Sequence, residues 1–463
     1  MATREPIPTY VLGVGMTEFI KPRGLRDYPE LGYEAGIKAM LDAQINYDDV
    51  QTGIAGFNYG DSTCGQRVFY QFGMTSIPIV NTGNACATGS AALYLARTMI
   101  RAGALDCVLV VGFEKMEPGP IRDKWTDRAK PTQLSRQMME DMRGPAPGPP
   151  NAQYFANAGR EYMEKYISNE GEFVEDFAEI ARVSHEHSQR NPYAQFRQAY
   201  SLQAILDAPM ICPPLTKLQC SPTSDGAGAA VVVSQRFLDA RPHLRGQAVL
   251  MAGQQLATDS PRLYAARSAI DLVGYDMTRR AVAAALREAQ TSLDAVRVCE
   301  LHDCFSANAL VLLESLGFSG VGAAHEMVRR GDITYGGRVV VNPSGGLISK
   351  GHPLGATGLA QCAELVWQLR GWANNRLVRD VDVALQHNLG LGGATVVTVY
   401  KRADGGKNAA VSDEQIAKSS WLGYNPAVEA RGFREADAAK VRSRTARSEY
   451  ALSDTQKKIE ARL

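Results

Sequence analysis

The same order of strands and helices occurs twice along this chain of 463 residues. Each half runs from a strand through an amphipathic helix and a second strand to a helix that opens at a glycine-containing turn, and then to a last strand. The strand segments are 9–14, 54–59 and 107–111 in the first half, and 247–251, 296–301 and 381–385 in the second. This alternation predicts an α/β protein with largely parallel sheets, and its repetition predicts two related halves.

The composition is that of a large folded protein without a strong charge preference. Hydrophobic residues make up 45% and charged residues 21% of the chain, and 50 basic side chains face 49 acidic ones for a net charge of +1. The surface as a whole therefore has no electrostatic attraction to nucleic acid or an anionic membrane. A phosphate-bearing ligand must be bound by a local patch of basic residues. No run approaches the roughly 18 apolar residues of a membrane helix, and the N-terminus lacks a signal-sequence pattern, so we expect an intracellular protein.

The repeated pattern breaks down between the halves and again near the C-terminus. The middle stretch contains a Gly/Pro-rich run at 144–150, which indicates an insertion that covers a site, and its basic residues form either a phosphate patch or an ordinary solvated face. These basic residues include Lys124, Arg128, Lys130 and Arg136. From 403 onward the chain is polar and has no sustained apolar face. We predict an N-terminal half, a loop domain, a C-terminal half and a polar tail, at 1–113 (completed by 221–240), 114–220, 241–402 and 403–463.

One of the eight cysteines is placed where a thiolate can form. The cysteines show neither a disulfide framework nor a paired Cys-x-x-Cys motif, so we expect reduced thiols, most of them buried as small apolar side chains. Cys86 lies among small residues where a helix begins. The free N–H groups and the dipole of a helix N-terminus lower a thiol pKa from about 8.5, so Cys86 is a candidate nucleophile.

His352 occupies the place in the second half that Cys86 occupies in the first. It lies in the glycine-rich segment 351–358, just before a helix. Glycine lets the backbone approach a ligand closely, and a histidine beside a cysteine is a common means of activating the thiol. We therefore expect Cys86 and His352 to act together.

A second thiol and a second imidazole follow the strand 296–301. His302 and Cys304 alternate across Asp303, so both project to one side if the chain stays extended. If the halves pack about a pseudo-twofold axis, these two side chains, Cys86, His352 and His387 converge at one end of the fold. A zinc site is the competing interpretation, but the spacing matches no zinc motif, and we predict no metal.

Three ordered motifs resemble the thiolase superfamily, and more narrowly the sterol carrier protein x type of 3-ketoacyl-CoA thiolase. They are the segments 84–89, 302–305 and 351–358, and the resemblance extends from about 9 to 401. It implies two half-domains in five αβαβα layers, an inserted loop domain and a homodimer. It also implies acyl-CoA and CoA as substrates, with no bound cofactor.

The resemblance also implies roles for the candidate residues. The cysteine matching Cys86 takes the acyl group as a thioester, and the histidine matching His352 lowers its pKa and helps hold the thioester oxygen. Many thiolases carry Asn-Glu-Ala-Phe and Cys-x-Gly-x-Gly motifs, whereas here His302 stands for the Asn and His387 stands about where the second cysteine would be. Cys304 then supplies the acid/base thiol, and His387 is a supporting residue rather than a catalyst.

The predicted activity is thiolytic cleavage of 3-oxoacyl-CoA, with branched-chain and sterol side-chain substrates among the candidates. Two alternatives remain open: a biosynthetic thiolase working in the Claisen direction, and a noncatalytic or aldolase-like homologue that acts with a partner. The final residues Ala461-Arg462-Leu463 resemble the peroxisomal Ser-Lys-Leu signal, so we expect binding to the import receptor and a peroxisomal location rather than a glycosome-like organelle or the cytoplasm.

Overall fold

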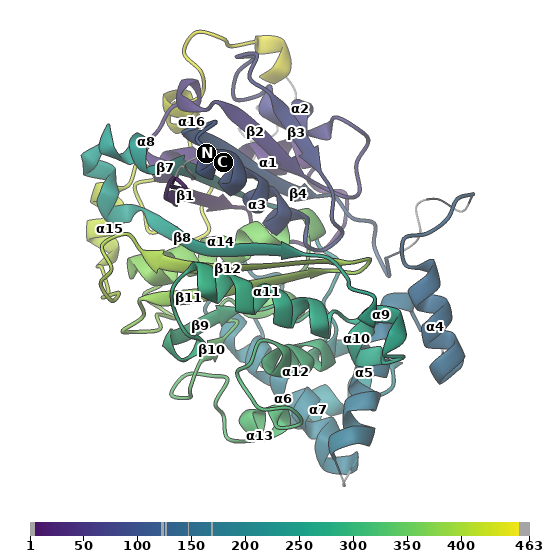
Figure 1. Cartoon of the computed structure of the whole chain (residues 1–463). Coiled ribbons are helices and arrows are strands. Elements are labelled where there is room, and N and C mark those ends of the chain that lie inside the picture. Colours follow the sequence, from purple (N-terminus) through teal and green to yellow (C-terminus); the bar gives the residue numbers. More distant parts are fainter. Residues whose placement is uncertain (1–4, 122–124, 126, 147, 168–169, 453–463) are drawn as a thin grey trace.

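The computed structural model describes residues 5–121, 125, 127–146, 148–167 and 170–452 (Figure 1). Ten strands form one sheet in the order β10-β9-β11-β12-β8-β1-β7-β4-β2-β3. The strands of the N-terminal half are β1 (Thr9–Met16), β2 (Thr52–Gly56), β3 (Ile79–Thr82), β4 (Cys107–Glu114) and β7 (Gly226–Ser234). Those of the C-terminal half are β8 (Val249–Ala257), β9 (Val296–Glu300), β10 (Val340–Val341), β11 (Val383–Gly390) and β12 (Ala394–Arg402).

The two halves match strand for strand. Outward from the junction they run β1-β7-β4-β2-β3 and β8-β12-β11-β9-β10, and within the sheet two residue pairs between β1 and β8 connect the two sets of strands. In each half the outer three strands are parallel and the two nearest the junction are antiparallel. The duplication is therefore confirmed, but the expectation of largely parallel sheets is wrong. A tight connection such as 391–393, between β11 and β12, can join only antiparallel strands.

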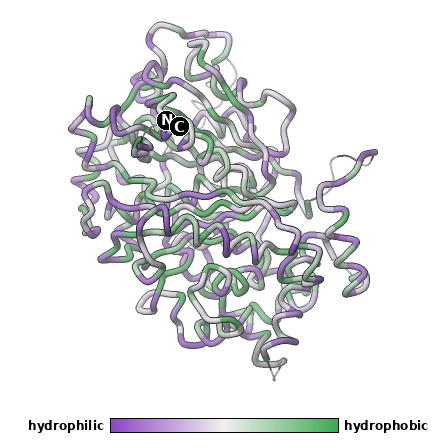
Figure 2. The backbone as a smooth tube through the Cα atoms, in the orientation of Figure 1, coloured by the Kyte–Doolittle hydropathy of each residue, from purple (hydrophilic) through white to green (hydrophobic). Residues whose placement is uncertain are grey.

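Helices fill the space between and outside the two half-sheets. α1 (Tyr28–Ala43) covers the outer face of the N-terminal half, while α11 (Tyr275–Glu288) and α12 (Ser306–Ser315) lie on the outer side of the C-terminal half. α3 (Thr88–Arg101) and α14 (Leu354–Arg370) lie between the half-sheets, and every residue of α14 is buried. The predicted five αβαβα layers are confirmed. Hydrophobic positions gather along the strands and central helices (Figure 2).

The inserted segment packs beside the C-terminal half, at the lower right of Figure 1. It contains α4 (Gln133–Arg143), α5 (Pro150–Tyr166), α6 (Glu170–Ser188), α7 (Leu202–Leu206), β5 (Met210–Cys212) and β6 (Leu215–Thr216). At the described ends of the Gly/Pro-rich run, Gly144 is the C-cap of α4, and Pro149 and Pro150 open α5, where a proline needs no N–H partner. Five short α-helices among the described residues lie elsewhere in the two halves: α2 (Cys64–Phe69), α8 (Gln235–Asp239), α9 (Arg262–Ala265), α10 (Ala269–Leu272) and α13 (Ala324–Arg329). None of the described helices is long and apolar enough to cross a membrane.

The segment after 403 lies along the body of the protein. It contains α15 (Asp413–Ser419) and α16 (Glu435–Val441), and it buries apolar side chains at scattered positions. Ile416 reaches the central core, whereas Phe433 and Val441 join the core beneath α1. Buried apolar positions spaced this far apart along the segment produce no sustained apolar helix face. The sequence pattern therefore indicated only a polar tail.

Glycines allow α3 and α14 to approach very closely at their N-terminal ends. A Cβ atom on Gly355 would lie 2.6 Å from the carbonyl oxygen of Gly56 and 2.7 Å from that of Phe113, and one on Gly89 would lie 2.7 Å from the oxygen of Gly355. On Gly358 it would collide with the Ser90 side chain. These positions exclude any larger residue, because the opposing atoms are backbone or tightly held.

We predict that Gly355→Ala destabilises the protein by about 1–3 kcal/mol, because the added methyl group meets backbone atoms that have no room to move. Helix propensity alone predicts the opposite effect, an increase of about 1 kcal/mol in the free energy of unfolding. Urea unfolding measures the difference. Gly246→Ala is the matched control, since nothing lies within 4 Å of its added Cβ. Equal or greater stability of the Gly355 variant would show that α14 is not closely packed against the ends of β2 and β4.

Candidate active site

Cys86 lies in a tight turn between β3 and α3. Ala85 has a left-handed backbone (φ 47°), and the hydroxyl of Thr88 holds the turn by accepting from the Asn84 N–H (2.7 Å) and donating to the Ala85 carbonyl (2.7 Å). The Asn58 amide also donates to that carbonyl, at 3.0 Å. A non-glycine residue in this conformation costs about 1–2 kcal/mol, and the hydrogen bonds offset that strain. The turn presents the Cys86 side chain to a pocket.

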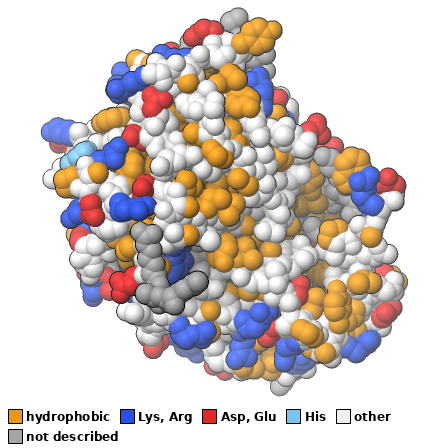
Figure 3. Space-filling model, turned by 45° about the horizontal axis from the view of Figure 1, so that its top comes forward, with side chains coloured by type: hydrophobic (Ala, Val, Ile, Leu, Met, Phe, Trp, Pro, Cys, Tyr) orange, Lys and Arg blue, Asp and Glu red, His pale blue; other side chains and the backbone are white. Residues whose placement is uncertain are grey.

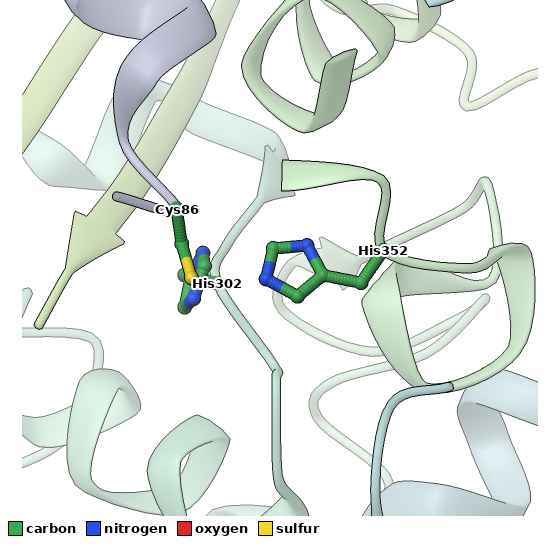
Figure 4. A group of neighbouring side chains, drawn as sticks. All are labelled: Cys86, His302 and His352. Carbon is green, nitrogen blue, oxygen red and sulfur yellow. The ribbon is translucent and has the colours of Figure 1, made fainter. Parts of the chain in front are cut away.

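Two imidazoles approach Cys86 from other parts of the chain (Figure 4). His302 follows β9, and His352 precedes α14. The Cys86 sulfur and one ring nitrogen of each histidine all lie within 4.8 Å of one another. The ring centroids of the two histidines are 5.2 Å apart, with an interplanar angle of 80°. Segments from both halves thus contribute to one cluster, as the repeated order led us to expect.

The cluster lies in a pocket of about 610 Å³, which Cys304 also lines. A pocket of this size holds a drug-sized ligand. Its walls come from both halves and from the inserted segment, and most of them are apolar. They include Met116, Ile121, Ala152, Phe155, Ile211, Phe305, Ile348, Leu389 and Leu391. Among the described residues, the cationic side chains of Lys21, Arg23 and Lys217 also line it.

The hydrogen bonds of His352 determine which ring nitrogen carries its proton. The Thr357 hydroxyl lies 2.7 Å from Nδ1 and donates its single hydrogen to the Pro353 carbonyl at 3.0 Å. Nδ1 therefore donates to Thr357, and the buried Nε2, which has no protein partner, presents its lone pair. Burial and the nearby Lys350 lower the pKa of His352 to about 3. The neutral ring is a proton acceptor beside Cys86.

Cys86 itself rests as a thiol rather than a thiolate. Burial, and then the charge of Glu114, raise its pKa to about 12. This shift is opposite in direction to the expected lowering of the pKa, and burial is its largest cause. Glu114 is buried and accepts hydrogen bonds from the N–H groups of Tyr59 and Gly355, and burial raises its own pKa to about 7.

Cys304 is a second protonated thiol. Its side chain is buried, and burial, followed by the neighbouring ionisable groups Cys86 and Asp303, raises its pKa well above the usual value. The Asn308 amide nitrogen lies 3.8 Å from its sulfur. At neutral pH Cys304 therefore carries a proton that it can give to a developing carbanion, which makes it suitable as a general acid.

His387 does not reach the pocket. It lies on β11 with Nε2 3.0 Å from the hydroxyl of Thr278 on the outer helix α11. Successive side chains alternate across a strand, so the next residue, Asn388, faces the site. The Asn388 amide nitrogen lies 2.9 Å from His302 Nδ1. The sequence analysis missed Asn388, although this alternation would have indicated it once the strand register was known.

The other candidates are distributed as follows. Lys124 lies outside the described residues, and Arg128, Lys130 and Arg136 do not line the pocket. Arg128 and Arg136 instead pair with the neighbouring acidic side chains Asp127 and Glu140.

His185, which the sequence analysis also missed, lines the pocket with both ring nitrogens hydrogen-bonded. Among the described residues, Cys86, His302 and His352 also form a group that could hold a metal ion. The absence of a metal remains a prediction.

We predict that alkylation of Cys86 by iodoacetamide accelerates about tenfold per pH unit from pH 7 to pH 10. With a pKa of about 12, the thiolate fraction still rises over this whole range. Peptide mass spectrometry measures the label on the Cys86 peptide, and Cys86→Ala gives its background. A plateau below pH 8 would contradict the resting thiol and indicate a preformed thiolate–imidazolium pair.

Comparison with known proteins gives consistent matches along the chain. Residues 9–200 match the family model described as thiolase, N-terminal domain, and residues 262–402 match the thiolase C-terminal domain-like model. The chain is 49% identical over 406 residues to sterol carrier protein 2 from Bos taurus, covering 87% of this chain and 74% of that protein.

Solved structures share the fold. The Ltp2-ChsH2(DUF35) aldolase aligns with a TM-score of 0.72 at 24% identity, over 86% of this chain and 99% of that one. Human mitochondrial 3-ketoacyl-CoA thiolase in complex with CoA aligns with a TM-score of 0.61 at 18% identity, over 86% and 98%.

Proposed function

The chain belongs to the thiolase family, and on that premise we propose that it catalyses CoA-dependent cleavage of 3-oxoacyl-CoA through an acyl-enzyme on Cys86. The observation that carries this proposal is the grouping of three reactive groups in one pocket. The Cys86 thiol lies beside the free Nε2 of His352, and a second protonated thiol, Cys304, lines the same pocket.

In the first half-reaction the Cys86 sulfur attacks C3 of the substrate while its proton passes to Nε2 of His352. The negative charge that develops on the C3 oxygen is stabilised by hydrogen bonds from the pocket, with His352, now protonated, as one donor. The carbonyl then re-forms, and the C2–C3 bond breaks. Its electron pair leaves on C2 of the departing acyl-CoA, and Cys304 protonates that carbon. The products are a thioester on Cys86 and a Cys304 thiolate.

The second half-reaction returns every proton to its origin. The Cys304 thiolate takes the proton of an incoming CoA thiol, and the CoA sulfur attacks the thioester. The shortened acyl-CoA leaves, and the Cys86 sulfur recovers its proton from His352. No other acid or base is needed, because the two thiols and the imidazole exchange only the protons that they hold at rest.

The pocket lining suits the two parts of such a substrate. Apolar side chains such as Phe155 and Phe305, whose rings stack at 4.9 Å, suit an acyl chain. The cations of Lys21, Arg23 and Lys217 suit the phosphates of CoA. Because the net charge of the chain is close to zero, local groups such as these must bind the phosphates. The volume exceeds the need of an acetoacetyl group, which supports longer or 2-methyl-branched 3-oxoacyl substrates.

A homodimer is the proposed assembly. β3 is the outermost strand of the N-terminal half, its residues are only half-buried, and Tyr70 and Met74 nearby are 40% and 47% exposed. Hydrophobic side chains gather on the face of the molecule turned forward in Figure 3. An open strand edge beside apolar surface favours pairing with a second copy. Light scattering should give twice the mass of one chain, and the mass of a single chain would refute the dimer.

A peroxisomal location is also proposed. Its support is the terminal Ala461-Arg462-Leu463, which lies outside the described residues. The full chain with a fluorescent protein at its N-terminus should reach peroxisomes, and the same fusion without the last three residues should not. Equal distribution of both fusions would exclude this signal.

We predict that Cys86→Ala abolishes measurable thiolysis and that Cys304→Ala lowers kcat about 10²- to 10⁴-fold, the usual contribution of a general acid. The assay follows cleavage of acetoacetyl-CoA and of a 2-methyl-branched 3-oxoacyl-CoA. Cys220→Ala is the matched control, because this third thiol lines the pocket without a role in the mechanism. Full activity in either of the first two variants would disprove the role assigned to that residue. Product formed only in the condensing direction would favour a biosynthetic enzyme.

A further inference from the structure

We propose that Asn388 and Ser90 are positioning residues that hold His302 in the tautomer whose Nε2–H points into the pocket, which makes His302 a hydrogen-bond donor to the substrate oxygen. The inference rests on the proposed function, in which negative charge develops on that oxygen. The proposal gives a function to two buried side chains that have no other role in the reaction. Asn388 and Ser90 come from different halves of the fold, on β11 and α3.

A chain of buried hydrogen bonds connects these residues. The Gln386 amide nitrogen lies 2.9 Å from the Ser90 hydroxyl, and that hydroxyl lies 2.9 Å from the Asn388 side-chain oxygen. The Asn388 amide nitrogen in turn lies 2.9 Å from Nδ1 of His302. All four side chains are at most 1% exposed, so water does not compete for these bonds.

The direction of donation along this series of hydrogen bonds is determined at Gln386, the residue farthest from His302. The Gln386 amide nitrogen also lies 2.7 Å from the carbonyl oxygen of Gly358, which can only accept a hydrogen bond. The Gln386 oxygen meanwhile accepts from the Tyr400 hydroxyl at 2.7 Å. Gln386 must therefore direct its N–H groups toward Gly358, because a reversed amide would place two acceptor oxygens against each other. Its two hydrogens serve its two shortest contacts, Gly358 and Ser90, while the Gln361 side-chain oxygen lies farther away at 3.3 Å.

The orientation of Gln386 determines which group donates at each later step, at Ser90, Asn388 and His302. Because the Ser90 oxygen accepts from Gln386, its single hydrogen is free to go to the Asn388 oxygen. Asn388 then turns its N–H₂ toward His302, so Nδ1 of His302 must be an acceptor. Burial and the neighbouring histidines lower the pKa of His302 well below its usual value. A neutral imidazole that accepts at Nδ1 carries its one hydrogen on Nε2.

The two histidines of the pocket therefore have opposite roles. His352 presents a lone pair that can take the Cys86 proton, whereas His302 presents an N–H that can stabilise the substrate oxygen. In the other tautomer, a His302 lone pair would repel the same oxygen. An Nε2 that carries hydrogen is also a poor metal ligand, so the chain of bonds favours acyl chemistry over a metal at these three side chains.

Asn388→Leu and Ser90→Ala test the proposal by interrupting the chain at two points. Leu is close to Asn in shape but offers neither donor nor acceptor, and Ala at 90 leaves Asn388 in place without its fixed orientation. We expect kcat for acetoacetyl-CoA thiolysis to fall about 100-fold in the first variant and about tenfold in the second, with KM changed less than threefold. Thr278→Val is the matched control, since it removes the bond to the neighbouring His387 and should leave kcat unchanged.

Two readouts separate positioning from a merely structural role. In a His302→Ala background, Asn388→Leu should cost no more than about twofold further, because the residue through which it acts is gone. The ¹⁵N NMR shifts of His302, assigned with His302→Ala, should report hydrogen on Nε2 in the wild type and a mixture of tautomers in both variants.

The proposal is overturned if either variant keeps wild-type kcat, if the loss persists in the His302→Ala background, or if wild-type His302 carries its hydrogen on Nδ1. If Asn388→Leu fails to fold, Ser90→Ala decides the kinetic outcome. A wild-type protein that cleaves no 3-oxoacyl-CoA would refute the proposed function, while the NMR measurement would still decide the tautomer.

Discussion

The close approach of α3 to α14 is the contact on which the active site depends. Cys86 precedes the first of these helices and His352 precedes the second by only a few residues, so the distance between the helices sets the distance between the thiol and its base. Gly89 and Gly358 permit this approach, because a side chain on either would meet the opposite helix, and Gly355 lets α14 approach the ends of β2 and β4. The same packing brings Ser90 against β11, where Asn388 lies. One contact between the duplicated halves thus joins the nucleophile, the base and the oxygen-binding histidine.

Burial gives these groups their resting charge states. Removing a charge from water is costly, so the thiols of Cys86 and Cys304 stay protonated and the rings of His302 and His352 stay neutral. Charge appears on these four side chains only as the substrate reacts. Fixed hydrogen bonds from Thr357 and Asn388 then decide which imidazole accepts a proton and which donates one. A neutral but oriented site needs little reorganisation when charge develops.

Much of this arrangement could be predicted from the sequence. The repeated order of elements indicated an α/β fold in two related halves, and the family resemblance implied its five layers. The equivalent positions of Cys86 and His352 indicated that they meet. Other features could not be predicted, because they depend on register and burial. Whether His387 or Asn388 faces the site follows from a shift of one residue in β11. The direction of the Cys86 pKa shift follows from the amount of water excluded, and the pocket cations come from 21–23 and 217 rather than from the basic residues near 130.

The most direct test is to trap the acyl-enzyme. The protein is mixed with acetoacetyl-CoA in the absence of free CoA, quenched in acid and digested, and the peptides are analysed by mass spectrometry. We expect one acetyl group on the Cys86 peptide, its disappearance when CoA is added before the quench, and no adduct in Cys86→Ala. Acetylation of Cys304 or Cys220 in its place, or turnover without any acyl-enzyme, would contradict Cys86 as the nucleophile.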